Sequence, residues 1–264
     1  MTNALIGYTG FVGTTLLKQG KFESTFRSTN IGEIDDQSFD TVVCAGAPAQ
    51  KWIANREPGA DLRNIDVLIN HLRRVQCRHF TLISTVDVFK SPLDVDETTP
   101  VDETGLHAYG LNRRRLEKFV QSHFPDHLIV RLPGLVGPGL RKNVIFDFLN
   151  DNNVAAIDSR GVFQFYPMIN LAYDVATARN AGLRLIHLTA EPISVADISA
   201  LGFGKPFAQH LGNPPARYNM RTRHAALFGT SGDYQYSARE TVQAVRAYAQ
   251  SEPATVKAAE GSGS

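Results

Sequence analysis

The chain has 264 residues, 43% of them hydrophobic, which is enough to bury one large α/β core. Its 27 basic and 26 acidic residues leave a formal net charge of +1, so no nucleic acid or membrane surface is expected as a partner. Two cysteines, no signal-peptide pattern and no apolar run as long as a membrane span favour a reduced, cytoplasmic setting.

Strand and helix patterns alternate along most of the chain. Short apolar runs predict strands at residues 4–8, 22–27, 41–45, 80–84, 128–132, 161–166 and 185–188. A first helix is predicted to follow the first strand and to end near residue 18. Helical spacing of apolar residues predicts four more helices, at residues 61–74, 109–120, 144–149 and 171–183, and Leu62 and Ile65 lie on one face of the first of these four. Ser194 has the position of a helix cap, with Asp197 in the first turn.

This alternation predicts an α/β fold, a doubly wound parallel Rossmann sheet with a small, partly interleaved C-terminal lobe. We expect residues 1–140 to form a dinucleotide-binding domain that residues 168–190 complete. Residues 141–167 and 191–250 are expected to form the substrate-binding lobe. The small and polar residues at 251–264 predict a disordered tail.

Three glycines, Gly7, Gly10 and Gly13, follow the first expected strand and open the first helix. Glycines at such a junction allow a tight turn, a close approach of the backbone to a pyrophosphate, and close packing of helix on strand. The helix N-terminus then offers free N–H groups to phosphate oxygens. The loop therefore predicts a bound nicotinamide dinucleotide, with further contacts from Thr9, Phe11 and Val12.

The glycine spacing is GxxGxxG, and four later segments support a family resemblance: TVVCAGAPAQ (residues 41–50), LISTVDVF (82–89), HAYGLNRRRLE (107–117) and VRLPGLVGPG (130–139). Together they resemble the extended branch of the short-chain dehydrogenase/reductase superfamily, which contains nucleotide-sugar epimerases, dehydratases and reductases. The resemblance covers most of residues 4–200. It implies an NAD(P)-dependent oxidoreductase or epimerase that acts on a nucleotide-linked sugar or a similar small carbonyl or alcohol substrate.

The resemblance assigns the catalytic roles to Thr85, Tyr109 and Arg113. Tyr109 would be the general acid/base, and the hydroxyl of Thr85 would orient the substrate oxygen. A phenol has a pKa of about 10 in water, and a nearby cation lowers it. Arg113 stands where the family has lysine; it keeps the charge but stays protonated and cannot relay a proton. Two outcomes are open: a working but altered enzyme, which we favour, or a cofactor-binding sensor or scaffold with little catalysis.

For the cofactor, the resemblance adds contacts from Tyr109 and Arg113 and from the strand ends at Ala45, Gly46, Ala47, Ser84, Leu132 and Pro133. NAD enzymes carry an acidic residue about 20 positions past the glycine loop, which binds the ribose hydroxyls. Here Ser28 takes that position and Arg27 stands beside it. Loss of the carboxylate removes repulsion against a 2′-phosphate, and arginine can pair with one. We therefore expect NADP in preference to NAD.

The substrate is expected to contact residues after the strand ends and in the C-terminal lobe: Trp52, Asp87, Gly134, Arg141, Asn143, Gln164 and Tyr166. Core packing for Trp52 and a solvated loop for Arg141 are equally open. Gly134 and Val136 replace an asparagine and a tyrosine of the family pattern, which leaves the exact substrate undetermined. No metal is expected, and the resemblance leaves room for a homodimer.

Overall fold

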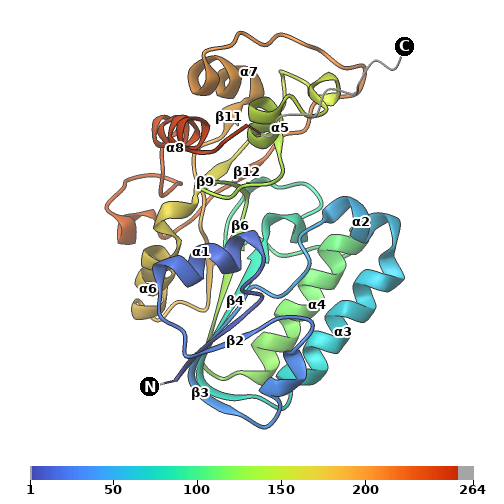
Figure 1. Cartoon of the computed structure of the whole chain (residues 1–264), viewed down its shortest axis with the longest axis vertical. Helices are drawn as coiled ribbons and strands as arrows, with labels where there is room; N and C mark the ends of the chain where they lie inside the picture. The colour runs from blue at the N-terminus through green and yellow to red at the C-terminus, as the bar shows by residue number, and fades with distance from the viewer. Residues whose placement is uncertain (1, 255–264) are drawn as a thin grey trace, which may run out of the picture.

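The computed structural model describes residues 2–254 and contains a central sheet of six parallel strands (Figure 1). The strand order is β10-β6-β4-β3-β1-β2, so the direction of winding reverses beside β1. This is the doubly wound Rossmann arrangement, which confirms the predicted fold class. The strands are β1 (Asn3–Ile6), β2 (Ser24–Phe26), β3 (Ser38–Cys44), β4 (Gln76–Thr85), β6 (His127–Leu132) and β10 (Leu185–His187).

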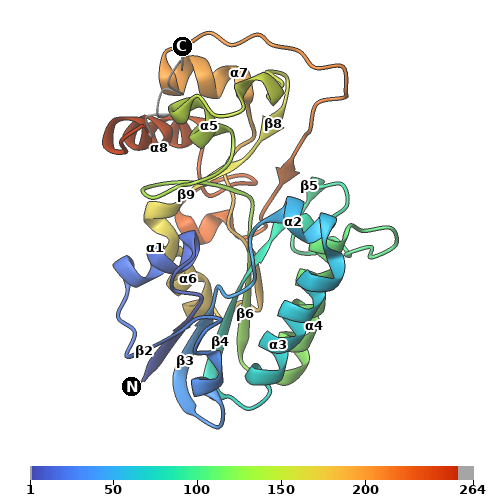
Figure 2. The same ribbon diagram turned by 45° about the vertical axis from the view of Figure 1, so that its right-hand side comes forward.

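Helices cover both faces of this sheet (Figures 1 and 2). On one face lie α1 (Phe11–Gln19) and α6 (Leu171–Asn180); on the other lie α3 (Pro58–Leu72) and α4 (Ala108–His123). Successive side chains of a strand point to opposite faces, so each strand feeds two cores. Within β3, Val42 packs in the core under α3 and α4, whereas Val43 packs under α1 and α6.

One helix face differs from its predicted pattern. In α3, Ile65 and Leu72 are fully buried as expected, but Leu62 is 37% exposed. Asp61, one turn before Ile65, takes the buried position instead and is 5% exposed. The interpretation of Leu62 as a core residue is therefore wrong, and the buried face carries an acid that needs a partner.

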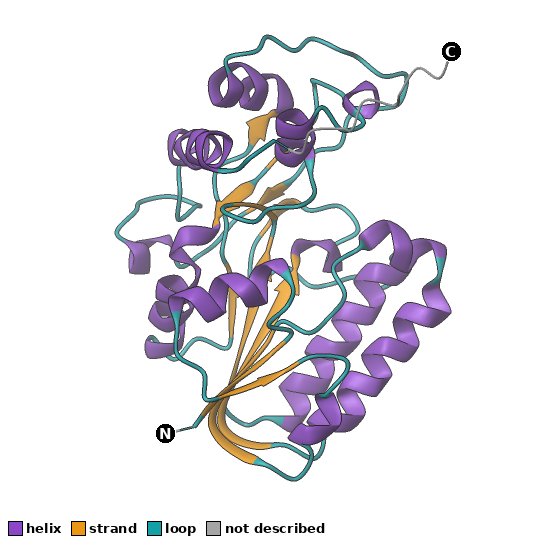
Figure 3. Cartoon of the chain, in the orientation of Figure 1, coloured by secondary structure: helices purple, strands orange, loops and turns teal. Residues whose placement is uncertain are grey.

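The C-terminal lobe lies beyond the carboxyl edge of the sheet, in the upper part of Figure 1. The segment predicted as one strand at residues 161–166 forms two, β8 (Val162–Phe163) and β9 (Phe165–Pro167). They pair with different partners, β8 with β11 (Ile193–Ser194) and β9 with β7 (Gly134–Val136). Figure 3 shows how short strands and helices of the lobe are joined by long loops; its helices are α5 (Val144–Asn150), α7 (Val195–Asp197) and α8 (Ala238–Ser251).

The cap predicted at Ser194 is present, because its side-chain oxygen accepts from the backbone N–H of Asp197 at 3.0 Å. A further pairing joins β12 (Asn219–Met220) to β5 (Leu93–Val95), which connects the lobe to the segment that follows β4. The tail predicted at residues 251–264 begins inside α8, and residues 255–264 lie outside the described residues. Within residues 2–254, none of the helices combines the length and the apolar character that crossing a membrane requires.

Candidate active site

The glycine loop joins β1 to α1. At two of its positions only glycine fits, because other backbone atoms lie where a Cβ would be. Gly7 has φ +85°, and a Cβ there would lie 2.7 Å from the backbone N of Gly46. A Cβ at Gly13 would lie 2.7 Å from the carbonyl carbon of Gly7 and would overlap its oxygen. Gly10 differs, because the nearest atom to a Cβ there is 3.5 Å away. Two glycines therefore shape the loop, and the side of Gly10 stays open.

The N-terminus of α1 fits an anionic group. Gly10 caps the helix without any side-chain hydrogen bond, and no acidic residue stands in the first turn. The first N–H groups of a helix have no acceptor within the helix, and the helix dipole favours negative charge beside them. Phe11 and Val12 turn their side chains into the core under α1 and α6, so only their backbones face the loop. These residues fit the pyrophosphate of a dinucleotide.

The other predicted cofactor residues come together at one edge of the sheet. The register pairs Ile6 with Cys44 and Thr85 with Leu132, so the parallel strands end side by side. The half-buried segment 45–47 follows β3, and Pro133 follows β6. This edge, beside the strand where the winding reverses, is where α/β sheets bind their ligands.

Tyr109 lies in the first turn of α4, next to Thr85 at the end of β4. The Tyr109 side chain is 8% exposed, and a hydrogen bond with the Thr85 hydroxyl favours the ionised phenol. Two contacts fix the start of this helix. The backbone N–H of Tyr109 donates to Oδ1 of Asn55 at 3.0 Å, and that of Gly110 donates to Nδ1 of His107 at 3.0 Å. The structure thus brings the two predicted catalytic hydroxyls together.

Burial raises the pKa of Tyr109, and the charges around it do not reverse that effect. The charge of Arg113 and the Thr85 hydrogen bond oppose the rise, while Asp87 adds to it. Arg113 lies over the ring, with its guanidinium carbon 4.0 Å from the ring centroid. Arg113 therefore lowers the pKa of Tyr109 as expected, but burial outweighs this effect and the pKa of the phenol stays raised.

Arg113 is held inside the protein. Its side chain is 3% exposed and forms a buried ion pair with Asp61, and it also donates to the carbonyl of Pro48. Any contact of Arg113 with a ribose has to compete with this ion pair, and breaking a buried pair is costly. Sequence reasoning missed Asp61. An acid at helical spacing from Ile65 and Leu72 was the signal that could have identified it.

Ser84 does not direct its hydroxyl at the cofactor edge. Its Oγ donates to Oε1 of Glu117 at 2.6 Å, and Glu117 has no exposed surface. Arg131 donates to the same carboxylate from Nε at 2.9 Å and from Nη2 at 2.8 Å. Thr85, the last residue of β4, is half-buried and interacts with Tyr109 instead. The predicted cofactor contact of the Ser84 hydroxyl is corrected accordingly.

Two predicted substrate contacts are core residues. Gln164 is 1% exposed and donates to Thr189 Oγ1 and to the carbonyl of Met220, both at 2.8 Å. Tyr166 is fully buried and donates to Oδ2 of Asp174 at 2.5 Å. Their polar atoms are satisfied within the protein, so the expectation that they contact the substrate is wrong.

Two further residues of this group have structural tasks. A Cβ at Gly134 would lie 2.6 Å from the carbonyl oxygen of Gln164, so the pairing of β7 with β9 requires glycine there. The side chain of Asn143 caps α5: its Oδ1 accepts from the N–H of Ile145 at 2.9 Å, and its Nδ2 donates to Leu135 O at 2.9 Å. Both residues are half-buried and have structural tasks, and their contact with a substrate stays a prediction.

Three predicted substrate residues remain accessible. Trp52, in α2 (Lys51–Arg56), is 63% exposed, with the Arg56 guanidinium 4.8 Å from its ring centroid, so the core-packing alternative is wrong. Arg141 is exposed as well. Asp87 is paired with Lys51 at 2.8 Å, a cation that sequence reasoning did not identify.

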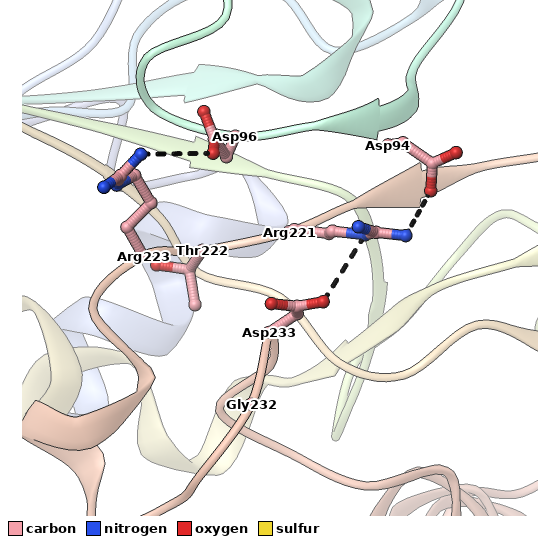
Figure 4. Close-up of a pocket in the computed structure, with 7 residues that line it drawn as sticks. All are labelled: Asp94, Asp96, Arg221, Thr222, Arg223, Gly232 and Asp233. Atoms are coloured by element: carbon pink, nitrogen blue, oxygen red, sulfur yellow. Dashed lines mark hydrogen bonds and ion pairs between the residues drawn. The ribbon is translucent and has the colours of Figure 1, made fainter.

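A charged cavity of about 380 Å³ lies elsewhere, where β5 meets β12 (Figure 4). Arg221 pairs with Asp94 at 2.5 Å and with Asp233 at 3.6 Å, and Arg223 pairs with Asp96 at 4.0 Å. Figure 4 shows these side chains turned toward one another across the cavity. Three carboxylates face two guanidiniums here, and the predicted catalytic residues do not line this cavity.

Comparison with models of protein families gives no match, and comparison with curated proteins gives none either. Solved structures do match. A dTDP-4-dehydrorhamnose reductase from Clostridium acetobutylicum superposes with a TM-score of 0.71 at 18% identity, covering 95% of this chain and 99% of that one. RMD from Pseudomonas aeruginosa, solved with NADPH, gives 0.69 at 15% identity, covering 95% and 99%.

A variant of UDP-glucuronic acid 4-epimerase from Bacillus cereus also matches, with a TM-score of 0.68 at 14% identity, covering 95% of this chain and 98% of that one. That structure contains UDP-4-deoxy-4-fluoro-glucuronic acid and NAD. The chain therefore has the fold of the extended short-chain dehydrogenases/reductases, as its motifs predicted. Reductases and epimerases of sugar nucleotides are among the proteins that share this fold with it over nearly their whole length.

Proposed function

We propose that this chain is an NAD(P)-dependent oxidoreductase or epimerase of the extended short-chain dehydrogenase/reductase type. Its substrate is a nucleotide-linked sugar or a similar small carbonyl or alcohol compound. The observation that carries the proposal is the meeting of the Thr85 and Tyr109 hydroxyls at the carboxyl edge of the sheet, next to the glycine loop. The sugar nucleotides bound or named in the similar structures support the substrate class.

In this proposal Tyr109 moves the proton. Its phenol donates to the carbonyl oxygen of the substrate in reduction and accepts from the hydroxyl in oxidation. Thr85 donates a hydrogen bond to the same oxygen and holds it beside the phenol. A bound nicotinamide supplies or accepts the hydride at the neighbouring carbon. Arg113 holds the ring of Tyr109 from its face and, with Asp61, fixes the first turns of α4 against α3.

The cofactor proposed is NADP in preference to NAD. Arg27 and Ser28 follow β2 directly, and both are exposed. The backbone of Arg27 is fixed by a hydrogen bond from its N–H to Asn30 Oδ1 at 2.8 Å. An exposed guanidinium at this strand end can pair with a 2′-phosphate, and Ser28 brings no carboxylate to repel it.

A second candidate function is a cofactor-binding sensor or scaffold with little catalysis. Two observations favour it. Arg113 is already paired with Asp61 inside the protein, and the pKa of Tyr109 is raised. The two functions share cofactor binding and differ in turnover.

The test is turnover of nicotinamide cofactor by the purified chain with dTDP- and UDP-linked sugars, compared between wild type and Tyr109→Phe. We expect the variant to lose turnover by about 10²- to 10⁴-fold, the usual contribution of a general acid or base. Tyr173→Phe, on α6 and 75% exposed, is the matched control. Equal turnover of wild type and Tyr109→Phe would rule out the assigned base. Cofactor binding without any turnover would favour the sensor.

A further inference from the structure

A second cation stands beside the catalytic hydroxyls, and it comes from a different helix than Arg113. Lys51 begins α2, and its Nζ lies 2.8 Å from Oδ1 of Asp87. The phenol of Tyr218 lies 3.4 Å from the same carboxylate oxygen. Asp87 is two residues after Thr85, and its N–H donates to the Thr85 hydroxyl oxygen at 3.2 Å. The Lys51–Asp87 pair therefore adjoins the oxygen that contacts Tyr109.

The placement of Lys51 is fixed by the way α2 docks on α4. Asn55, one turn after Lys51 on the same face of α2, accepts the backbone N–H of Tyr109 at 3.0 Å. The helix α2 thus makes two contacts at the site. Asn55 binds the main chain of Tyr109, and Lys51 binds Asp87 near the Tyr109 side chain. Movement of α2 away from the site requires the loss of both contacts.

Lys51 and Arg113 differ in what they can do. Arg113 is 3% exposed and its donors go to Asp61 and to Pro48. The Lys51 side chain is 38% exposed, so its ammonium reaches water while it holds Asp87. An ammonium has three donors and can exchange a proton, whereas a guanidinium stays protonated. Of these two cations, Lys51 is the one whose charged group reaches water.

We propose that Lys51 is the positioning residue that keeps Tyr109 competent for proton transfer, by neutralising the Asp87 carboxylate beside the catalytic hydroxyls. The proposal rests on the proposed function of Tyr109. Asp87 raises the pKa of Tyr109 and Lys51 lowers it, so removal of the lysine leaves an acid uncompensated at the site. The charged and titratable groups that face this pair are His107 and Arg113 of α4, Tyr218 before β12, and Lys142 before α5.

The test is a direct titration of Tyr109 in the full-length chain by NMR of tyrosine labelled at Cζ, with Tyr109→Phe to assign the signal. Lys51→Met is expected to raise the pKa of Tyr109, because it removes a cation that lowers this pKa and leaves the Asp87 carboxylate uncompensated. Asp87→Asn is expected to lower it, and the double variant is expected to lie between the two. Lys51→Arg is expected to restore the wild-type value.

Lys142→Met is the matched control, because Lys142 is also a cleft cation but bonds to the carbonyl of Ala49 instead of Asp87. An unchanged pKa in Lys51→Met, or an equal shift in Lys142→Met, would overturn the proposal. The titration needs neither cofactor nor substrate. Shifts of the expected sign in a chain without turnover would therefore refute the proposed function and leave the electrostatic coupling in place.

Discussion

The glycines of the first loop allow a test that separates the shape of the loop from its contact with a ligand. Helix propensity alone predicts that Gly13→Ala, inside α1, stabilises the chain by about 1 kcal/mol. The structure predicts the opposite sign. A Cβ at Gly13 would lie 2.7 Å from the carbonyl carbon of Gly7 and 2.8 Å from Cα of Tyr8. Both are backbone atoms, so α1 has to move away from the loop.

We expect this displacement to cost about 3 kcal/mol, the upper end of the range for overpacking. After the gain of about 1 kcal/mol from helix propensity, Gly13→Ala should lower the free energy of unfolding by about 2 kcal/mol. Gly10→Ala is the comparison. Its Cβ meets no atom closer than 3.5 Å, and its φ of −77° suits alanine. We expect its stability to stay within about 1 kcal/mol of wild type, since the loss at the cap and the gain in the unfolded chain offset each other.

The two variants should separate in a pair of measurements. Urea unfolding should show a large loss of stability for Gly13→Ala and little change for Gly10→Ala. Fluorescence titration with NADPH should show binding weakened tenfold or more in Gly10→Ala, because the added methyl group faces the open side of the loop; tenfold corresponds to about 1.4 kcal/mol. Wild-type affinity in Gly10→Ala, or wild-type stability in Gly13→Ala, would refute this account of the loop.

Three further predictions concern the cofactor and the buried carboxylate. Arg27→Ala should weaken NADPH binding and leave NADH binding nearly unchanged, measured by the same titration; equal losses for both would show that Arg27 does not contact a 2′-phosphate. Glu117→Ala should lower the free energy of unfolding in urea by about 3–5 kcal/mol, because it leaves the buried Arg131 without its carboxylate partner. Arg115→Ala breaks an exposed pair with Asp66 and should lower it by less than about 1 kcal/mol. Burial opposes ionisation of Glu117, but Arg131 and the other donors outweigh it and lower its pKa. The stability that it contributes should therefore be complete above about pH 4.5 and be lost as the pH falls through the lowered value, a loss that Glu117→Ala should lack.

Local patterns in the sequence were sufficient for the six strands of the central sheet, for the helices α1, α3, α4 and α6 that cover it, and for the loop. The parallel sheet follows from apolar runs whose residues are buried on both faces, and this requirement can be read within a few residues. Gly7 needs its positive φ within the loop, although the atoms that crowd it belong to Ala45 and Gly46 after β3. Gly13 could be identified because the atoms that crowd it belong to the loop itself. The cap at Ser194 was predictable for the same reason, since its acceptor and donor are three residues apart.

The direction in which polar side chains point depended on partners far along the chain. Gln164 and Tyr166 were expected at the substrate, yet their partners Met220 and Asp174 draw them into the core. A polar residue in a short apolar segment has the same local pattern whether it faces a cleft or a buried acceptor. That choice is made by tertiary contacts, which a single sequence does not reveal.

The residues of the candidate site show the same difference between local motifs and tertiary contacts. The sequence alone predicted that a glycine loop, a threonine and a tyrosine belong to one site, because each stands at a recognisable place in its local motif. Only the tertiary structure decided where the charges go: Arg113 pairs with Asp61 and Lys51 pairs with Asp87. Each pair joins separate elements, and charges attract whatever is near in space, so chain distance carries no information about the choice.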